Sequence, residues 1–146
     1  MSHVLTRAAI VAEAREWIGT RYRHQGSLKG VGCDCLGLVR GVWRNCIGSE
    51  PETPPPYAPD WAEASGAETL AEAALRHLMP MMRDEIGGGD VLLFRWREGF
   101  VAKHAAIATG EGTMIHAHDG AAVCEVALSP WWQRRLAFAF RFPGID

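Results

Sequence analysis

Hydrophobic residues recur at helical spacing in the first third of the chain. One stripe predicts a helix over residues 4–18 that ends at Gly19 and consists of Ile10, Val11, Ala14, Trp17 and Ile18. A second stripe predicts a helix from Asp34 or Cys35 to about Ile47 and consists of Leu38, Val39, Val42, Trp43 and Cys46. The glycine-bearing residues 20–33 between them are expected to form a loop.

The middle of the chain breaks this pattern. Residues 49–60, SEPETPPPYAPD, contain five prolines in twelve positions and predict a surface loop within the domain. Residues 61–79 are rich in Ala and Glu and predict a third helix that ends at Pro80.

Short apolar or alternating runs follow, separated by glycine-bearing turns. They predict about five strands in an antiparallel meander, at 91–96, 103–110, 113–118, 121–128 and 135–142. Residues 129–135 are expected to make a short helical turn. Helices followed by strands predict an α+β fold, with the helices on one face of the sheet and a single domain over residues 1–146.

Composition narrows the functional classes. The 146 residues are 48% hydrophobic and 22% charged, which is typical of a globular domain, and the net charge of −2 predicts no direct nucleic-acid binding. No apolar run approaches the roughly 18 residues of a membrane span. Charged residues where a signal peptide needs its apolar core predict synthesis in a cytoplasm without a signal peptide, and the four cysteines predict no disulfide framework.

Cys35 is the candidate nucleophile. A thiol on the first turn of a helix lies near unpaired N–H groups and the positive end of the helix dipole, which predicts a lowered pKa. The alternative is a small buried apolar residue. Cys46 and Cys124 are expected in the core, and Cys33 is left open, with packing favoured over chemistry.

Two histidines can serve this thiol. His104 opens a strand and His116 lies on the next one, so antiparallel pairing can make them neighbours, one as base and the other orienting it. The alternative is one structural and one surface histidine, and His3 and His77 are expected on exposed helical positions. A metal is not expected, because C-x-C at Cys33 and Cys35 lacks the spacing of zinc sites, even with His116 and His118 nearby.

Two further residues flank the candidate site. Asp34 is expected to cap the helix, and Tyr22 can donate to a developing oxyanion beside the Cys35 backbone N–H, or merely pack in its loop.

Five segments together resemble the NlpC/P60 family of papain-like cysteine peptidases. The family pattern is Y-x-W-G-G, D-C-S-G-L-V, G-D-L, H-V-G-I and I-H-A. The corresponding segments are YRHQG (22–26), CDCLGLV (33–39), GDVLLF (89–94), HAAIATG (104–110) and MIHA (114–117). The chain departs from the pattern at Leu36 for serine, Cys33 for an aromatic residue, and His24-Gln25-Gly26 for the W-G pair.

The resemblance implies a role for each candidate residue. Cys35 would be the nucleophile, His104 the general base, His116 the residue that orients it, and Tyr22 with Asp34 the oxyanion and positioning groups. The implied substrate is an amide bond of peptidoglycan stem peptides, commonly D-γ-glutamyl–diaminopimelate, with no metal or organic cofactor.

As a single domain expected to have no signal peptide, with AFRFPG at 139–144, the chain also resembles the phage cell-wall peptidases encoded with tail genes, including those of gene transfer agents. This implies tail tip or hub proteins as partners and action at the bacterial cell wall or periplasm. Three alternatives stay open: a catalytically silent component of a tail tip, a metal- or redox-active Cys/His protein, and an acyltransferase or different amidase on the same fold.

Overall fold

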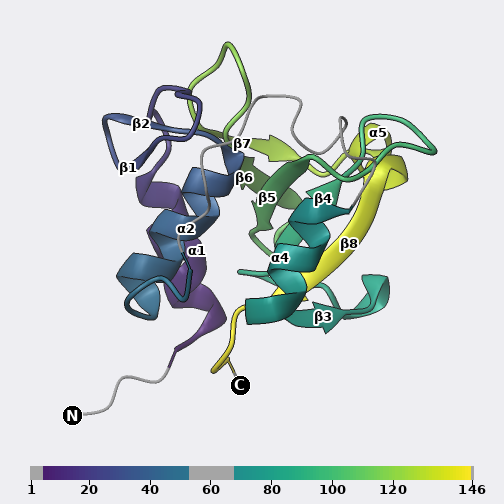
Figure 1. Cartoon of the computed structure of the whole chain (residues 1–146), viewed down its shortest axis with the longest axis horizontal. Helices are drawn as coiled ribbons and strands as arrows, with labels where there is room; N and C mark the ends of the chain where they lie inside the picture. Colours follow the sequence, from purple (N-terminus) through teal and green to yellow (C-terminus); the bar gives the residue numbers. More distant parts are fainter. Residues whose placement is uncertain (1–4, 53–67, 146) are drawn as a thin grey trace.

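The computed structural model describes residues 5–52 and 68–145, which form a helical layer against a curled antiparallel sheet (Figure 1). The helices are α1 (Arg7–Glu16), α2 (Cys35–Cys46), α4 (Thr69–His77), the 3₁₀ turn η1 (Arg83–Glu85) and α5 (Pro130–Arg135). The strands are β1 (Ser27–Leu28), β2 (Gly32–Cys33), β3 (Met79–Met81), β4 (Val91–Phe94), β5 (His104–Ala108), β6 (Thr113–His116), β7 (Cys124–Ala127) and β8 (Leu136–Arg141). Within the described ranges, no helix is long and apolar enough to cross a membrane.

Helix α1 is shorter than the predicted 4–18. Thr6 caps it by accepting a hydrogen bond from the Ala9 N–H at 3.0 Å, and the chain leaves the helix after Glu16. Ile18 is 45% exposed, which corrects its assignment to the apolar stripe, because helical periodicity no longer applies in the turn before Gly19. The other four stripe residues, Ile10, Val11, Ala14 and Trp17, are buried as expected.

Helix α2 confirms its prediction, with Asp34 as N-cap and Cys35 as first residue. Leu38 and Val42 are fully buried, and the rest of its apolar face packs against the same core. The preceding segment, residues 20–33, was expected to be a loop, but β1 and β2 pair there as a two-stranded hairpin. The second strand of the hairpin ends at Cys33, directly before the N-cap of α2.

The region around Pro80 corrects a second expectation. Of the predicted helix 61–79, residues 61–67 lie outside the described residues, and α4 ends at His77. Pro80 is not merely a helix stop, because it lies in β3, which among the described strands pairs with β8 alone. Proline is tolerated in such an edge strand, where its missing N–H need not face a partner. Most of the proline-rich segment 49–60 also lies outside the described residues.

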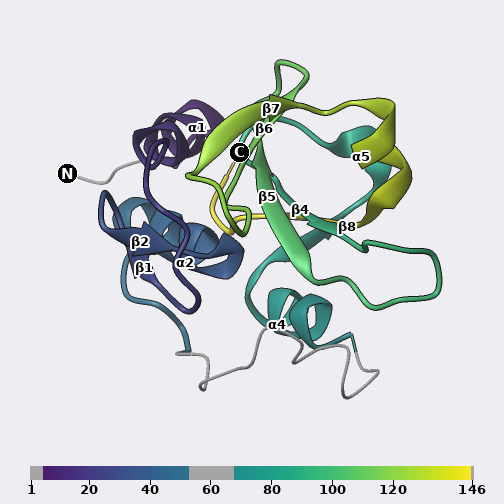
Figure 2. The same ribbon diagram turned by 90° about the horizontal axis from the view of Figure 1, so that it is seen from above.

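The main sheet has six strands rather than about five, in the order β3-β8-β4-β5-β6-β7. Only β4 to β7 form the predicted meander. After β7 the chain crosses through α5 and returns as β8 on the other side of β4 (Figure 2). The α+β class is confirmed, and α5 is the crossing element that carries the chain back to the sheet.

The sheet separates two apolar cores. The larger one lies under the helices, where Trp17 at the C-cap of α1, Leu38 of α2 and Leu70 of α4 meet the sheet, so these helices share one face as expected. The smaller core lies on the opposite face around Leu92, Phe94 and Met114, and Trp132 of α5 packs against it. The sheet is therefore buried on both faces.

Asp90, in the GDV segment before β4, joins distant parts of the fold. Its carboxylate is fully buried and lies 3.1 Å from the Arg7 guanidinium of α1 and 3.5 Å from Arg141 of β8. It also accepts a hydrogen bond from the Gly87 N–H at 2.9 Å. This motif residue is structural and lies away from the candidate site.

Gly41→Ala on α2 is expected to destabilise the protein by about 1–3 kcal/mol, because a Cβ there would collide with the Trp17 indole. Helix propensity alone predicts the opposite sign, a gain of about 0.5–1 kcal/mol. Urea denaturation followed by circular dichroism measures the difference. The same substitution in a Trp17→Leu background should cost less, and a Gly41→Ala protein more stable than wild type would contradict the close packing.

Candidate active site

Cys35 lies at the junction of the two layers. As the first residue of α2, its half-buried thiol faces the start of β5, and the Sγ donates a long hydrogen bond to the Lys103 carbonyl at 3.9 Å. The thiol borders a cavity of about 210 Å³. The cavity is lined by Tyr22, His24, Asp34, Cys35, Leu36, Leu70, Trp96, Lys103, His104, Ala117, His118 and Asp119.

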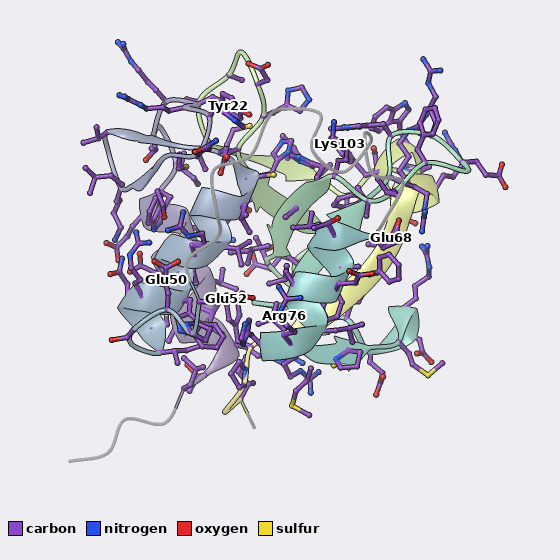
Figure 3. All side chains as sticks on the ribbon, in the orientation of Figure 1. Tyr22, Glu50, Glu52, Glu68, Arg76 and Lys103 are labelled. Atoms are coloured by element: carbon purple, nitrogen blue, oxygen red, sulfur yellow. The ribbon has the colours of Figure 1, made fainter. Side chains whose placement is uncertain are left out.

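Tyr22 and Lys103 mark this cavity in Figure 3, at the end of the molecule where α2 begins. Tyr22 lies in the loop after α1, and Lys103 is the residue directly before β5. The cavity is therefore built by the helical half and the sheet half together.

Asp34 holds the first turn of α2 against the Tyr22 loop. One carboxylate oxygen accepts from the Gly37 N–H at 2.7 Å, and the other accepts from the Gln25 N–H at 2.8 Å. Gln25 has a φ of 65°, a left-handed conformation that is strained for a side chain with a Cβ. The predicted cap is confirmed, and the same carboxylate also fixes the loop that carries Tyr22.

Asp34→Ala is expected to destabilise the fold by about 1–3 kcal/mol, because the buried Gly37 N–H and the partly buried Gln25 N–H lose their acceptor. Asp34→Asn keeps one acceptor oxygen, so its stability should lie between that of wild type and that of Asp34→Ala. Chemical denaturation of the three proteins measures this order. Equal stability of wild type and Asp34→Ala would contradict the structural role.

His104 and His116 form a buried pair. His104 Nε2 lies 2.8 Å from His116 Nδ1, and both residues are 4% exposed. We assign the proton of this bond to His104 Nε2 and the acceptor role to His116 Nδ1, a tautomer that leaves His104 Nδ1 with a free lone pair. The structure thus brings together the two predicted histidines, with His104 lining the cavity and His116 behind it.

The pKa of Cys35 corrects the expectation of a lowered value. Burial, followed by the negative charge of Asp34, raises the pKa of the Cys35 thiol to about 11. Backbone N–H groups of Ala105, Leu36 and Cys35 itself act in the opposite direction, as the helix terminus predicts, but they are outweighed. The resting group is therefore a thiol.

The neighbouring groups are also neutral at rest. Burial, then the charges of His116 and His118, holds the pKa of His104 well below its usual value, and burial lowers the pKa of His116 to about 4. Burial, followed by repulsion from Cys35 once it is ionised at high pH and from Asp34 and Asp119, raises the pKa of Tyr22 to about 12, so its phenol stays a hydrogen-bond donor. A neutral thiol therefore lies beside a neutral base.

The other predicted residues lie elsewhere. Cys33 is fully buried, and burial raises the pKa of its thiol to about 12, so it packs in the core. Cys46 is half-buried and packs against the larger core, whereas Cys124 is half-buried and belongs to neither core of the described residues, which corrects its expected place. The His77 ring donates a hydrogen bond to the Glu52 carboxylate at 2.9 Å. His3 lies outside the described residues. In residues 5–52 and 68–145 no group of histidine, cysteine and carboxylate side chains could hold a metal ion.

Several cavity residues were missed from the sequence. The Trp96 and His104 ring centroids lie 5.1 Å apart. His118, which the sequence singled out only as a possible metal ligand, is exposed, and its ring centroid lies 5.9 Å from that of His104. Lys103 had one available signal, its position directly before His104. Trp96 had a weaker one, because it follows the strand whose Phe94 pairs with His104.

Comparison with known proteins gives a consistent result. A family model described as NlpC/P60 family matches residues 19–141. Over 137 residues the chain is 29% identical to the "Gamma-DL-glutamyl hydrolase" of Bacillus subtilis (strain 168), covering 93% of this chain and 29% of that protein. Over 127 residues it is 30% identical to "Murein DD-endopeptidase MepH" of Escherichia coli (strain K12), covering 85% of this chain and 41% of that protein. The chain thus spans less than half the length of these two curated relatives.

A solved structure is similar over nearly its whole length. The NlpC/p60 domain of peptidoglycan hydrolase SagA is 27% identical with a TM-score of 0.64, covering 93% of this chain and 98% of that one.

Proposed function

Because the chain belongs to the NlpC/P60 family, we propose that it is a cysteine peptidase that hydrolyses amide bonds in peptidoglycan stem peptides. The D-γ-glutamyl–diaminopimelate bond is the proposed target. The first relative, named as a γ-glutamyl hydrolase, supports this choice, whereas the second is named as a DD-endopeptidase. The papain-like α+β fold of the family is confirmed by the structural match.

One observation carries the proposal. The thiol of Cys35 and the base His104 border the same cavity, and His104 is held by His116 through a 2.8 Å hydrogen bond. A nucleophile, a base and a group that orients the base are the three parts that acyl transfer through a thiol requires.

The mechanism follows from the neutral pair. His104 Nδ1 accepts the Cys35 proton as the thiolate attacks the scissile carbonyl carbon. The Cys35 backbone N–H at the start of α2 and the Tyr22 phenol donate to the developing oxyanion. The imidazolium then protonates the leaving amine, and His104 activates the water that releases the acyl group from Cys35. His116 accepts from His104 Nε2 throughout.

Mass spectrometry of purified peptidoglycan tests the function. After incubation with the wild-type protein, we expect new termini at the D-γ-glutamyl–diaminopimelate bond, and none after incubation with Cys35→Ala. New termini at a different amide bond would replace the proposed target but keep the cysteine mechanism. An intact polymer in both samples would reject hydrolysis by this domain.

The raised pKa of Cys35 favours a second candidate, a catalytically silent component of a phage-like tail tip. A thiol that never transfers its proton to His104 would resist alkylation by iodoacetamide near neutral pH. Alkylation of Cys35 that is faster in wild type than in His104→Gln at pH 7.5 would reject this candidate. Equal, slow alkylation in both proteins would favour it.

We also propose that the enzyme is assembled into a phage-like tail and acts at the bacterial cell wall during DNA delivery. The support is the sequence resemblance to tail-encoded cell-wall peptidases. If tail tip or hub proteins are its partners, particles purified from the producing cells should contain this chain at a fixed ratio to the tail proteins. Its absence from such particles would reject the association.

A further inference from the structure

Trp132 lies directly behind the histidine pair. Its indole stacks on the His104 ring, with centroids 5.6 Å apart and an angle of 28° between the planes. It also meets the His116 ring edge-on at 5.4 Å. Trp132 is the aromatic side chain from α5 that touches both members of the hydrogen-bonded pair.

We propose that Trp132 is a positioning residue that fixes the orientation of the His104–His116 hydrogen bond and shields it from water. Trp132 does not line the catalytic cavity, so it acts through the histidines and not on the substrate. This inference rests on the proposed function for its effect on turnover, but its effect on the imidazoles can be measured without substrate.

The surroundings of Trp132 explain how it can hold a ring in place. It packs against the second core, and the Phe94 ring lies 5.1 Å away at 67°. Phe94 pairs with His104 across the β4–β5 ladder. The tryptophan therefore packs on one face of the sheet, across the paired strands that carry Phe94 and His104.

Helix α5 is itself anchored at several points. Arg83 donates to the Gln133 carbonyl at 3.0 Å and to the Leu136 carbonyl at 3.1 Å. Arg135 donates to the Trp96 carbonyl at 3.3 Å. A six-residue helix would be marginal alone, so these bonds and the Trp132 packing fix its place over the sheet.

Water exclusion should show in the titration of the pair. Burial is the largest cause of the lowered pKa of both His104 and His116. Charged or titratable groups around the pair come from α2 and its cap, the Tyr22 loop, the residue before β5, the segment after β6, and α5. They are Cys35, Asp34, Tyr22, His24, Lys103, His118, Asp119 and Arg135. Arg135 shares α5 with Trp132 and stacks on the Trp131 ring, so Trp131→Ala controls for a movement of Arg135. A pKa shift that appears in Trp132→Leu and not in Trp131→Ala can therefore be assigned to lost shielding.

The experiment compares four proteins by NMR and kinetics. Trp132→Leu keeps apolar volume but removes the ring, Trp132→Phe keeps a stacking ring, and Trp131→Ala is the matched control. Trp131 is the adjacent residue of α5, 42% exposed, and it packs on the outer side of Trp132 at 4.8 Å. The measurements are the imidazole pKa values and the N–H resonance of the His104–His116 bond, with kcat and KM on peptidoglycan peptides.

We expect Trp132→Leu to raise both imidazole pKa values by about one unit or more and to weaken the N–H resonance through faster exchange with water. Its kcat should fall about 10- to 100-fold at nearly constant KM. Trp132→Phe and Trp131→Ala should resemble wild type in every measurement.

Folded Trp132→Leu with wild-type imidazole pKa values and an unchanged N–H resonance would overturn the proposal. If Trp132→Leu fails to fold, Trp132→Phe decides. Wild-type imidazole pKa values and a wild-type N–H resonance in Trp132→Phe support the proposal, and imidazole pKa values raised by about one unit or more overturn it. A wild-type protein without turnover would reject the proposed function, whereas the NMR comparison would still decide the role of Trp132.

Discussion

Cys35→Ala is expected to lose peptidoglycan hydrolysis by roughly 10⁴-fold or more while keeping its fold. Cys35 is a half-buried residue on the first turn of α2, and the side chain that caps this helix is Asp34, not Cys35. Removing one sulfur should therefore change the thermal midpoint by only a few degrees. Release of stem-peptide fragments and a thermal melt measure the two effects.

The chain offers two matched controls for this substitution. Cys46→Ala changes a half-buried thiol at the other end of the same helix, and Cys33→Ala removes a fully buried thiol two residues away. Both should keep wild-type turnover, and Cys33→Ala should lose more stability because it leaves a space in the core. Turnover by Cys35→Ala, or its loss in Cys33→Ala at full folding, would reject Cys35 as the single nucleophile.

The parts of the site that could be predicted are those set by local chain geometry. Asp34 and Cys35 fall at a loop-to-helix junction, which sequence pattern locates well, and the structure confirms both the cap and the helix start. His104 and His116 lie on consecutive strands joined by a tight turn, so their contact needed only local antiparallel pairing. The roles of these residues in catalysis stay a prediction that the substitutions above test.

The parts that could not be predicted depend on distant segments. Trp132 reaches the histidine pair only because the chain crosses from β7 through α5 and then places β8 beside β4. Nothing local to SPWWQRR specifies that return, and a meander was expected instead. The strand at Pro80 was missed for the same reason, because its partner β8 lies about sixty residues later in the chain.

The pKa of Cys35 shows a different kind of failure. The sequence reveals the helix terminus, which lowers the pKa, but it does not reveal how much solvent the neighbouring strands exclude. In the structure, burial and Asp34 together outweigh the backbone N–H groups. The thiolate is therefore not the resting form, and in the proposed mechanism it forms by proton transfer to His104.

This neutral pair leads to the second large expected effect, in His104→Gln. Loss of the base should lower kcat/KM about 10²- to 10⁴-fold near neutral pH. With a Cys35 pKa of about 11, the remaining activity should rise roughly tenfold per pH unit as free thiolate forms. Rates of hydrolysis and of iodoacetamide labelling between pH 6 and pH 9 measure this slope.

The wild-type protein should instead show a kcat/KM that hardly changes with pH. A lowered pKa keeps His104 neutral, and so able to accept a proton, well below pH 6.5, while the raised pKa keeps Cys35 protonated up to about pH 11. The reactive thiol–imidazole pair is thus fully populated between these limits, and kcat/KM should be nearly constant from about pH 6 to pH 9. An acid limb centred at or above pH 6.5 in wild type would show that His104 is not shielded as the structure places it. A steep profile shared by wild type and His104→Gln would show that His104 takes no proton from Cys35.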